Sequence, residues 1–180
     1  MFDQWQQPLD IPNLIRKGVT LEGEARISDL LSVKEAGKGA QASGRLGGIV
    51  LNDPLVRFVF SFGRNEAGHR LIEGRVDTTV DLTCQRCLEP VAVEIHAEVM
   101  LGVVNHEQDI GKLPESTEPL VLDENPVWLA DLIEDEILLA LPVVPRHEHL
   151  CAPSHREYED ADVVENPFAA LRGLVKPSTH

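Results

Sequence analysis

The chain has 180 residues, of which 43% are hydrophobic, so it can bury a core without help from disulfides or a metal. No apolar run approaches the roughly 18–20 residues that span a bilayer, and the start lacks the basic and apolar regions of a secretory signal. Three cysteines form an odd set without a disulfide-framework spacing, which is typical of a reducing compartment. We therefore expect a soluble, cytoplasmic protein.

The charge of the chain is strongly negative and unevenly distributed. The formal net charge is -14 at pH 7. Residues 1–75 hold ten Lys and Arg against nine Asp and Glu, whereas residues 76–180 hold six against twenty-one. Nucleic-acid binding depends on basic side chains that neutralise phosphates, so the second half is expected to repel RNA at long range. The acidic excess is either a solvated surface or a docking face for a basic partner.

Two short elements and a loop are predicted ahead of the first alternating segment. Residues 20–36 predict a short strand followed by a short helix, which Ser28 or Asp29 could cap. Residues 37–48 are rich in glycine and small residues, which indicates a loop. This loop lacks the GKS or GKT ending of a phosphate-binding loop.

Three segments, residues 55–62, 71–84 and 91–104, alternate apolar and polar residues. Alternation rich in β-branched residues and joined by short polar turns predicts an antiparallel meander with one face in water. The apolar positions expected on the buried face are Val56, Phe58, Phe60 and Phe62, then Ile72, Val76, Val80 and Leu82, then Val91, Val93, Ile95, Val99 and Leu101. Residues 105–119 are expected to form a polar loop, and 120–124 a further strand.

The main helix is predicted over residues 126–141. Asn125 suits the N-cap, Pro126 suits the first helical position, and Pro142 disfavours helix at the residue before it. Successive residues turn by about 100°, which places one apolar stripe on the side that should face the sheet. The stripe is formed by Leu129, Leu132, Ile133, Ile137 and Ala140.

Acidic side chains of this helix are predicted in two places. Asp131, Glu134 and Asp135 fall opposite the apolar stripe, and they form the candidate surface for a basic partner. Glu136 instead falls inside the stripe. A carboxylate there must reach water at an edge or find a donor, and an ion pair near the rim is the favoured expectation.

The composition after the helix changes from apolar to polar and acidic. Residues 146–165 are expected to form an irregular segment with little core, and 166–174 to form a short docked helix. The predicted fold is therefore α+β. Residues 1–145 form a single domain, an antiparallel β-sheet meander packed by one main helix, and residues 146–180 form an acidic, irregular C-terminal arm.

Two cysteines, Cys84 and Cys87, lie at the tip of the hairpin predicted between the second and third alternating segments. A CxxC turn can direct two thiolates at one cation, and a structural zinc site needs two further ligands. The stretch RHEHLC supplies His147 and Cys151 with a spacing that zinc sites use. The candidate metal ligands are therefore Cys84, Cys87, His147 and Cys151.

Three alternatives to this ligand set stay open. His149 or His155 could replace His147 as a ligand. A redox pair is disfavoured, because thioredoxin-type CxxC motifs gain their low thiol pKa at a helix N-terminus, whereas strand patterns flank this one. The cysteines could also be reduced and without a ligand role, since the core can fold without metal.

Motifs of nucleophilic and phosphate chemistry are absent from the sequence. There is no GxSxG elbow, no HExxH, and no dinucleotide or phosphate-loop fingerprint. Carboxylates at the spacing of Asp131, Glu134 and Asp135 could hold magnesium, but a solvated acidic face is far commoner. We expect a protein that is not an enzyme and whose one candidate cofactor is zinc.

Three motifs in this order resemble the bacterial YceD family, which is named for large ribosomal RNA subunit accumulation. They are LTCQRCLEPV, LIEDEILLALPVVPRHEHLC and NPFAAL, and the resemblance covers roughly residues 70–175. Gln85 and Arg86 match the box between the cysteines, Glu136 matches the acidic turn, and Pro142 ends the ALP motif. No catalytic residues are assigned to the family in general, so the resemblance transfers none.

The resemblance implies a non-enzymatic role in the synthesis, processing or stability of 23S rRNA during large-subunit biogenesis. In this family the coding gene often lies beside that of a small basic protein of the large subunit. Because the chain is acidic, the expected partner is a basic ribosomal protein or assembly factor, with 23S rRNA contacted directly or indirectly and no membrane involved.

Two other functions stay open. One is the regulation of a neighbouring metabolic enzyme, for which the sequence offers no specific feature. The other is direct binding of rRNA through the nearly neutral first half. The arginines that could line one edge for this purpose are Arg45, Arg57, Arg64, Arg70 and Arg75.

Overall fold

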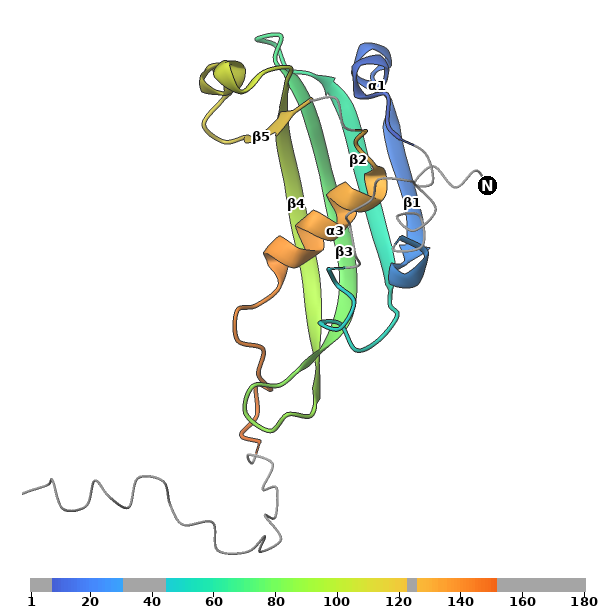
Figure 1. Cartoon of the computed structure of the whole chain (residues 1–180), viewed down its shortest axis with the longest axis vertical. Helices are drawn as coiled ribbons and strands as arrows, with labels where there is room; N and C mark the ends of the chain where they lie inside the picture. Colours follow the sequence, from blue (N-terminus) through green and yellow to red (C-terminus); the bar gives the residue numbers. More distant parts are fainter. Residues whose placement is uncertain (1–7, 31–44, 123–125, 152–180) are drawn as a thin grey trace, which may run out of the picture.

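The computed structural model describes residues 8–30, 45–122 and 126–151. Its sheet has five strands in the order β1-β2-β3-β4-β5 (Figure 1). Strands β1 to β4 pair antiparallel with their neighbours, whereas β5 pairs parallel to β4. The strands are β1 Thr20–Arg26, β2 Leu55–Arg64, β3 Arg70–Thr83, β4 Pro90–Val104 and β5 Glu118–Val121. The helices are α1 Ile11–Lys17, the 3-10 helix η2 Glu107–Lys112, and α3 Leu129–Ala140. The predicted α+β class is confirmed.

Strands β2, β3 and β4 form where the sequence alternates, because a strand that turns its apolar side chains to one face can bury all of them together. Every second residue of β2 from Val56 to Phe62 is buried, and so is every second residue of β3 from Ile72 to Leu82 except the half-buried Gly74. Val56, Phe60 and Val76 have no exposed surface. Val93 of β4 is only half-buried. The remaining apolar positions predicted for the buried face lie in the core.

The opposite face of the sheet carries polar side chains, which are exposed. The exposed side chains on this face include Glu22 and Glu24 of β1, Arg57 of β2, and Glu94 and Glu98 of β4. Helix α3 packs on the other side, against β4 and β3 (Figure 1). The sheet therefore has one apolar, covered face and one charged face, which we call the open face.

The segment after β4 is more ordered than the predicted polar loop. Its middle forms η2, and Lys112 contacts Asp109 across one turn at 2.6 Å. Strand β5 then begins at Glu118, two residues before the predicted start at Leu120. Since β5 runs parallel to β4, the chain must cross over between them, and η2 occupies this connection.

Helix α3 begins at Leu129, so the predicted start at Pro126 is wrong. Residues before the helix are drawn into extended pairing: the Leu9 N–H donates to the Val127 carbonyl at 2.8 Å, and Trp128 forms a bridge with Pro8. Trp128 is the N-cap, and its side chain makes no capping hydrogen bond. The predicted end before Pro142 is confirmed, because the helix stops at Ala140.

The helical turn after β1 starts at Ile27, so neither Ser28 nor Asp29 precedes it as the predicted cap. Asp53 fills this role instead, since its carboxylate accepts the Ser28 N–H at 2.9 Å. The predictions for residues 31–44, for Asn125, for His155 and for the helix at 166–174 lie outside the described residues. The division at residue 145 between a domain and an arm stays a prediction. In the part of the chain that is described, every helix is too short or too polar to cross a bilayer.

Gly74 of β3 lies where a side chain has no room. A Cβ added there would lie 2.4 Å from the carbonyl oxygen of Val59 and 2.9 Å from Cδ1 of Phe60. The first of these contacts is with backbone, so relief would require the paired strands β2 and β3 to separate locally.

Gly74→Ala is therefore expected to lower the free energy of unfolding by about 1–3 kcal/mol, as overpacked cores do. Urea unfolding followed by circular dichroism measures the change. Gly63→Ala is the matched control, because a Cβ at Gly63 in β2 would meet no atom within 4 Å. Equal stability of the two variants would contradict the close approach at Gly74.

Candidate metal centre

The turn between β3 and β4 presents two cysteines at one end of the sheet. The Cys84 N–H donates to the Glu89 carbonyl and the Leu88 N–H donates to the Cys84 carbonyl, both at 2.9 Å. Leu88 has a φ of 64°, a left-handed conformation that non-glycine residues rarely adopt. These bonds fold the turn back on itself and leave Cys84 and Cys87 on its inner side, where both are buried.

The chain returns to this turn after helix α3. Residues 141–151, which we call the post-helix segment, descend from α3 to the end of the β3–β4 hairpin (Figure 1). The Gln85 N–H donates to the Pro145 carbonyl at 2.8 Å, and Nη1 of Arg86 donates to the His149 carbonyl at 3.2 Å. The box between the two cysteines therefore fixes the path of the post-helix segment.

This docking brings together the four residues that the sequence selected as ligands. Sγ of Cys84 lies 3.8 Å from Sγ of Cys151, and Sγ of Cys87 lies 3.5 Å from Nδ1 of His147. One ligand atom from each residue lies within 4.8 Å of the others. We call this group the Cys/His cluster: Cys84, Cys87, His147 and Cys151.

The hydrogen bonding of His147 determines which of its ring nitrogens faces the cluster. Nε2 lies 3.0 Å from the Pro90 carbonyl, which can only accept a hydrogen bond. Nε2 therefore carries the proton in the neutral ring, and Nδ1 keeps a lone pair directed towards the sulfur atoms. His149, the alternative ligand, is exposed and lies against His147 with the ring centroids 4.8 Å apart and the rings tilted by 38°, but it is not part of the cluster.

The two thiols of the turn have pKa values shifted in opposite directions. Burial raises the pKa of the Cys84 thiol, but hydrogen bonds from the backbone N–H groups of Cys87, Arg86 and His147 outweigh it and lower that pKa to about 5. A backbone hydrogen bond from Glu89 lowers the pKa of Cys87, whereas burial and the neighbouring thiols raise it, and the net shift is upward. The surroundings thus stabilise a thiolate at Cys84 first.

Glu134 does not lie on a solvent face of α3, so that part of the predicted acidic surface is wrong. Its side chain is 1% exposed, and its carboxylate accepts the Leu46 N–H at 3.2 Å and contacts Arg45 at 3.4 Å. The segment that begins at Arg45 packs over this side of the helix. Asp131 and Asp135 are half-buried, and Asp135 pairs with Arg45.

Glu136 is half-buried at the edge of the apolar stripe, without the expected ion pair: no described residue forms one with it. Burial raises the pKa of Glu136, and the nearby carboxylates of Glu118 and Asp135 add to the increase. Pro142, the last residue of the family motif, is exposed where the post-helix segment begins.

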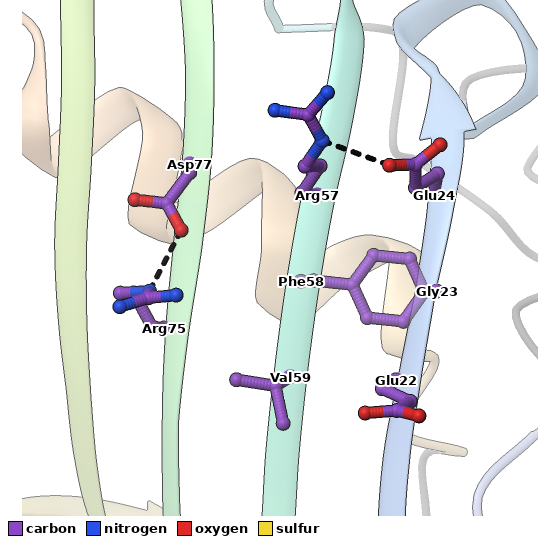
Figure 2. Close-up of a pocket in the computed structure, with 8 residues that line it drawn as sticks. All are labelled: Glu22, Gly23, Glu24, Arg57, Phe58, Val59, Arg75 and Asp77. Carbon is purple, nitrogen blue, oxygen red and sulfur yellow. Dashed lines mark hydrogen bonds and ion pairs between the residues drawn. The ribbon is translucent and has the colours of Figure 1, made fainter.

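The arginines proposed for RNA binding do not form one basic edge. On the open face, Nε of Arg57 contacts Glu24 at 2.8 Å and Nε of Arg75 contacts Asp77 at 2.7 Å (Figure 2). Arg45 lies on the other side of the sheet, beside α3. The other two lie near the β2–β3 turn, where Arg64 donates to the Gly68 carbonyl and Arg70 donates to Asn105.

The fold and the Cys/His cluster define an α+β protein with a candidate metal centre at the end of its longest hairpin. Residues 72–175, more than half of the chain, match the family described as Large ribosomal RNA subunit accumulation protein YceD. The chain belongs to the YceD family. All four residues of the cluster lie within the matched segment.

A curated relative carries the same family description. The chain is 37% identical over 113 residues to the Haemophilus influenzae protein named Large ribosomal RNA subunit accumulation protein YceD. The match covers 58% of this chain and 64% of the relative, so the chain spans less than two thirds of that protein's length. No solved structure matches the chain significantly.

The buried carboxylate of Glu134 is expected to stabilise the fold. Glu134→Ala removes the acceptor of the buried Leu46 N–H, and the free energy of unfolding is expected to fall by about 1–3 kcal/mol. Glu134→Gln keeps an acceptor oxygen and is expected to lose less. Asp135→Ala is the matched control, because the Asp135–Arg45 pair lies at the surface with about half of each side chain exposed, and surface ion pairs contribute less than about 1 kcal/mol. Denaturant unfolding that ranks Glu134→Ala no lower than Asp135→Ala would reject this role.

Proposed function

We propose that this protein is a non-enzymatic factor that supports 23S rRNA accumulation during assembly of the large ribosomal subunit, and that it acts by binding a basic protein. Membership of the YceD family carries the first part of the proposal. The relative from Haemophilus influenzae bears the same description. A cytoplasmic location follows from this role.

Electrostatics support a basic protein as the partner in preference to RNA. The net charge of -14 repels a polyphosphate chain, and contact with RNA would require arginines free to neutralise phosphates. Arg45, Arg57 and Arg75 are instead paired with carboxylates of this chain. Exchanging these pairs for phosphates would leave Glu24, Asp77 and Asp135 facing the same polyanion.

We propose the open face as the main part of the partner surface, with Asp131 and Asp135 of α3 as a second acidic region. A hollow of about 360 Å³ lies over β1, β2 and β3 on the open face, and Glu22, Glu24 and Asp77 are among the residues that line it (Figure 2). The outward positions of β1 to β4 carry more acids than bases. The acids are Glu22, Glu24, Glu73, Asp77, Asp81, Glu94 and Glu98, against the three arginines Arg26, Arg57 and Arg75.

Affinity purification of the tagged full chain from growing cells tests this function. We expect basic large-subunit proteins or assembly factors to copurify, and depletion of the protein to lower the 23S rRNA level. Binding should weaken as salt rises from about 0.05 M to about 0.5 M, because screening reduces attraction between exposed charges. Recovery of rRNA alone after nuclease-free purification would favour direct RNA binding instead.

A charge-matched pair of variants locates the surface. The triple change Glu22→Gln, Glu94→Gln and Glu98→Gln is expected to weaken partner binding at low salt. The control carries the same charge change away from the open face, at the exposed Glu66, Glu107 and Glu115. Equal loss in both variants would mean that only the net charge matters, and no loss in either would remove the open face from the proposal.

A further inference from the structure

We propose that Cys84, Cys87, His147 and Cys151 bind one Zn²⁺ ion, and that this ion fastens the post-helix segment to the β3–β4 hairpin. The inference goes beyond the proposed function and does not depend on it. The ion would link a turn and a segment that are about 60 residues apart in sequence, as shown by the separation of Cys87 and His147.

The spacing of the ligand atoms fits a tetrahedral zinc site. With Zn–S distances of about 2.3 Å and Zn–N distances of about 2.0 Å, tetrahedral geometry places two sulfurs about 3.8 Å apart, and a sulfur and a nitrogen about 3.5 Å apart. The observed pairs are Cys84–Cys151 at 3.8 Å and Cys87–His147 at 3.5 Å. All four ligand atoms lie within 4.8 Å of one another, so the remaining pairs need to close by no more than roughly 1 Å on binding.

The chemistry of the donor set favours Zn²⁺ over the hard divalent ions. Three thiolates and one imidazole are soft and borderline ligands, which favour Zn²⁺ over the oxygen-seeking Mg²⁺ and Ca²⁺. Four protein ligands leave no open position for water or substrate, which is typical of a structural rather than a catalytic site. The Pro90 carbonyl supplies the outer hydrogen bond that such sites use to orient a ligating histidine.

The surroundings of the sulfur atoms point to a metal rather than to a redox pair. Cys84 and Cys87 lie in a turn between strands and not at a helix N-terminus, where thiolates of redox motifs are activated. The Arg86 N–H lies 3.5 Å from Sγ of Cys84, so the backbone of the turn donates to the sulfur. A donor directed at a buried sulfur stabilises the charged form that a metal requires.

The post-helix segment buries little apolar surface, so a bound ion would supply contacts to the hairpin that apolar packing does not. Val143 is 98% exposed and Leu150 is 94% exposed. Apart from the cluster, the described contacts that hold this segment to the hairpin are hydrogen bonds, such as those of Gln85 and Arg86. The sheet has its own apolar core, so the ion would order this segment without being required for the fold of the sheet.

Metal analysis of the full chain, purified under reducing conditions without chelator, tests the site. We expect about one zinc per chain in the wild type and in His149→Ala, which removes the neighbouring exposed histidine. Loss of a residue that only supports a metal ligand typically lowers metal affinity roughly 10- to 100-fold. His147→Ala and Cys151→Ser remove ligands themselves, so we expect their affinity for Zn²⁺ to fall by more than this. Zinc-free wild type that also fails to take up added Zn²⁺, or equal loss in His149→Ala, would overturn the ligand set.

Cobalt substitution provides an independent readout. Tetrahedral Co²⁺ with thiolate ligands is expected to give visible absorption and a sulfur charge-transfer band, and both should weaken in Cys151→Ser but not in His149→Ala. A spectrum of octahedral Co²⁺, or one unchanged by Cys151→Ser, would contradict the assignment. A Cys84–Cys151 disulfide that persists under mild reducing conditions in place of bound metal would contradict it as well.

Proteolysis tests the fastening itself. Arg146 is exposed in the post-helix segment, and trypsin cleavage after it is expected to accelerate at least about 10-fold when zinc is removed, because cleavage follows local opening. The strand signal in circular dichroism should stay unchanged over the same interval. Equal cleavage rates with and without zinc would refute the fastening, and a collapse of the strand signal would show that the ion holds the whole fold instead.

Discussion

The pairing of β3 with β4 is the constraint on which the rest of the structure depends. Its register runs from Leu71 opposite Gly102 to Thr83 opposite Pro90, and it fixes the position of the turn that follows. A slip of one residue in one of the two strands would move every apolar side chain of that strand to the open face. The same slip would turn the cysteines away from the inner side of the turn, so packing of the core and assembly of the cluster share one register.

Much of this arrangement could be predicted from sequence, because it follows from local periodicity. The alternation in 55–62, 71–84 and 91–104 specifies strands and the buried face without knowledge of their neighbours. The ligand set was accessible for a different reason. Thiol and imidazole donors are few in this chain, and their chemistry restricts how they can combine, so spacing and residue type nominated Cys84, Cys87, His147 and Cys151 but left His149 and His155 as alternatives to His147.

The features that sequence could not supply depend on contacts between distant segments. An ideal helical wheel places Glu134 opposite the stripe, but the turn at Leu46 covers that side and offers its N–H. The start of α3 depends on the pairing of Leu9 with Val127, which overrides the favourable Pro126. The proton position on His147 depends on Pro90, far away in sequence. Each is a tertiary effect on a locally plausible pattern.

Apolar and polar interactions stabilise different parts of this chain. Apolar burial holds the sheet and α3, whereas the post-helix segment is held by polar contacts and by the cluster. Cys84 and Cys87 belong to both, since they are buried among core residues and also face His147 and Cys151. The stable hairpin thus offers half of a ligand set that is already ordered, and only the post-helix segment would lose conformational entropy when a metal binds. Binding of an ion to a partly formed site of this kind would order only the post-helix segment. Such an ion would therefore control the position of that segment and not the stability of the sheet.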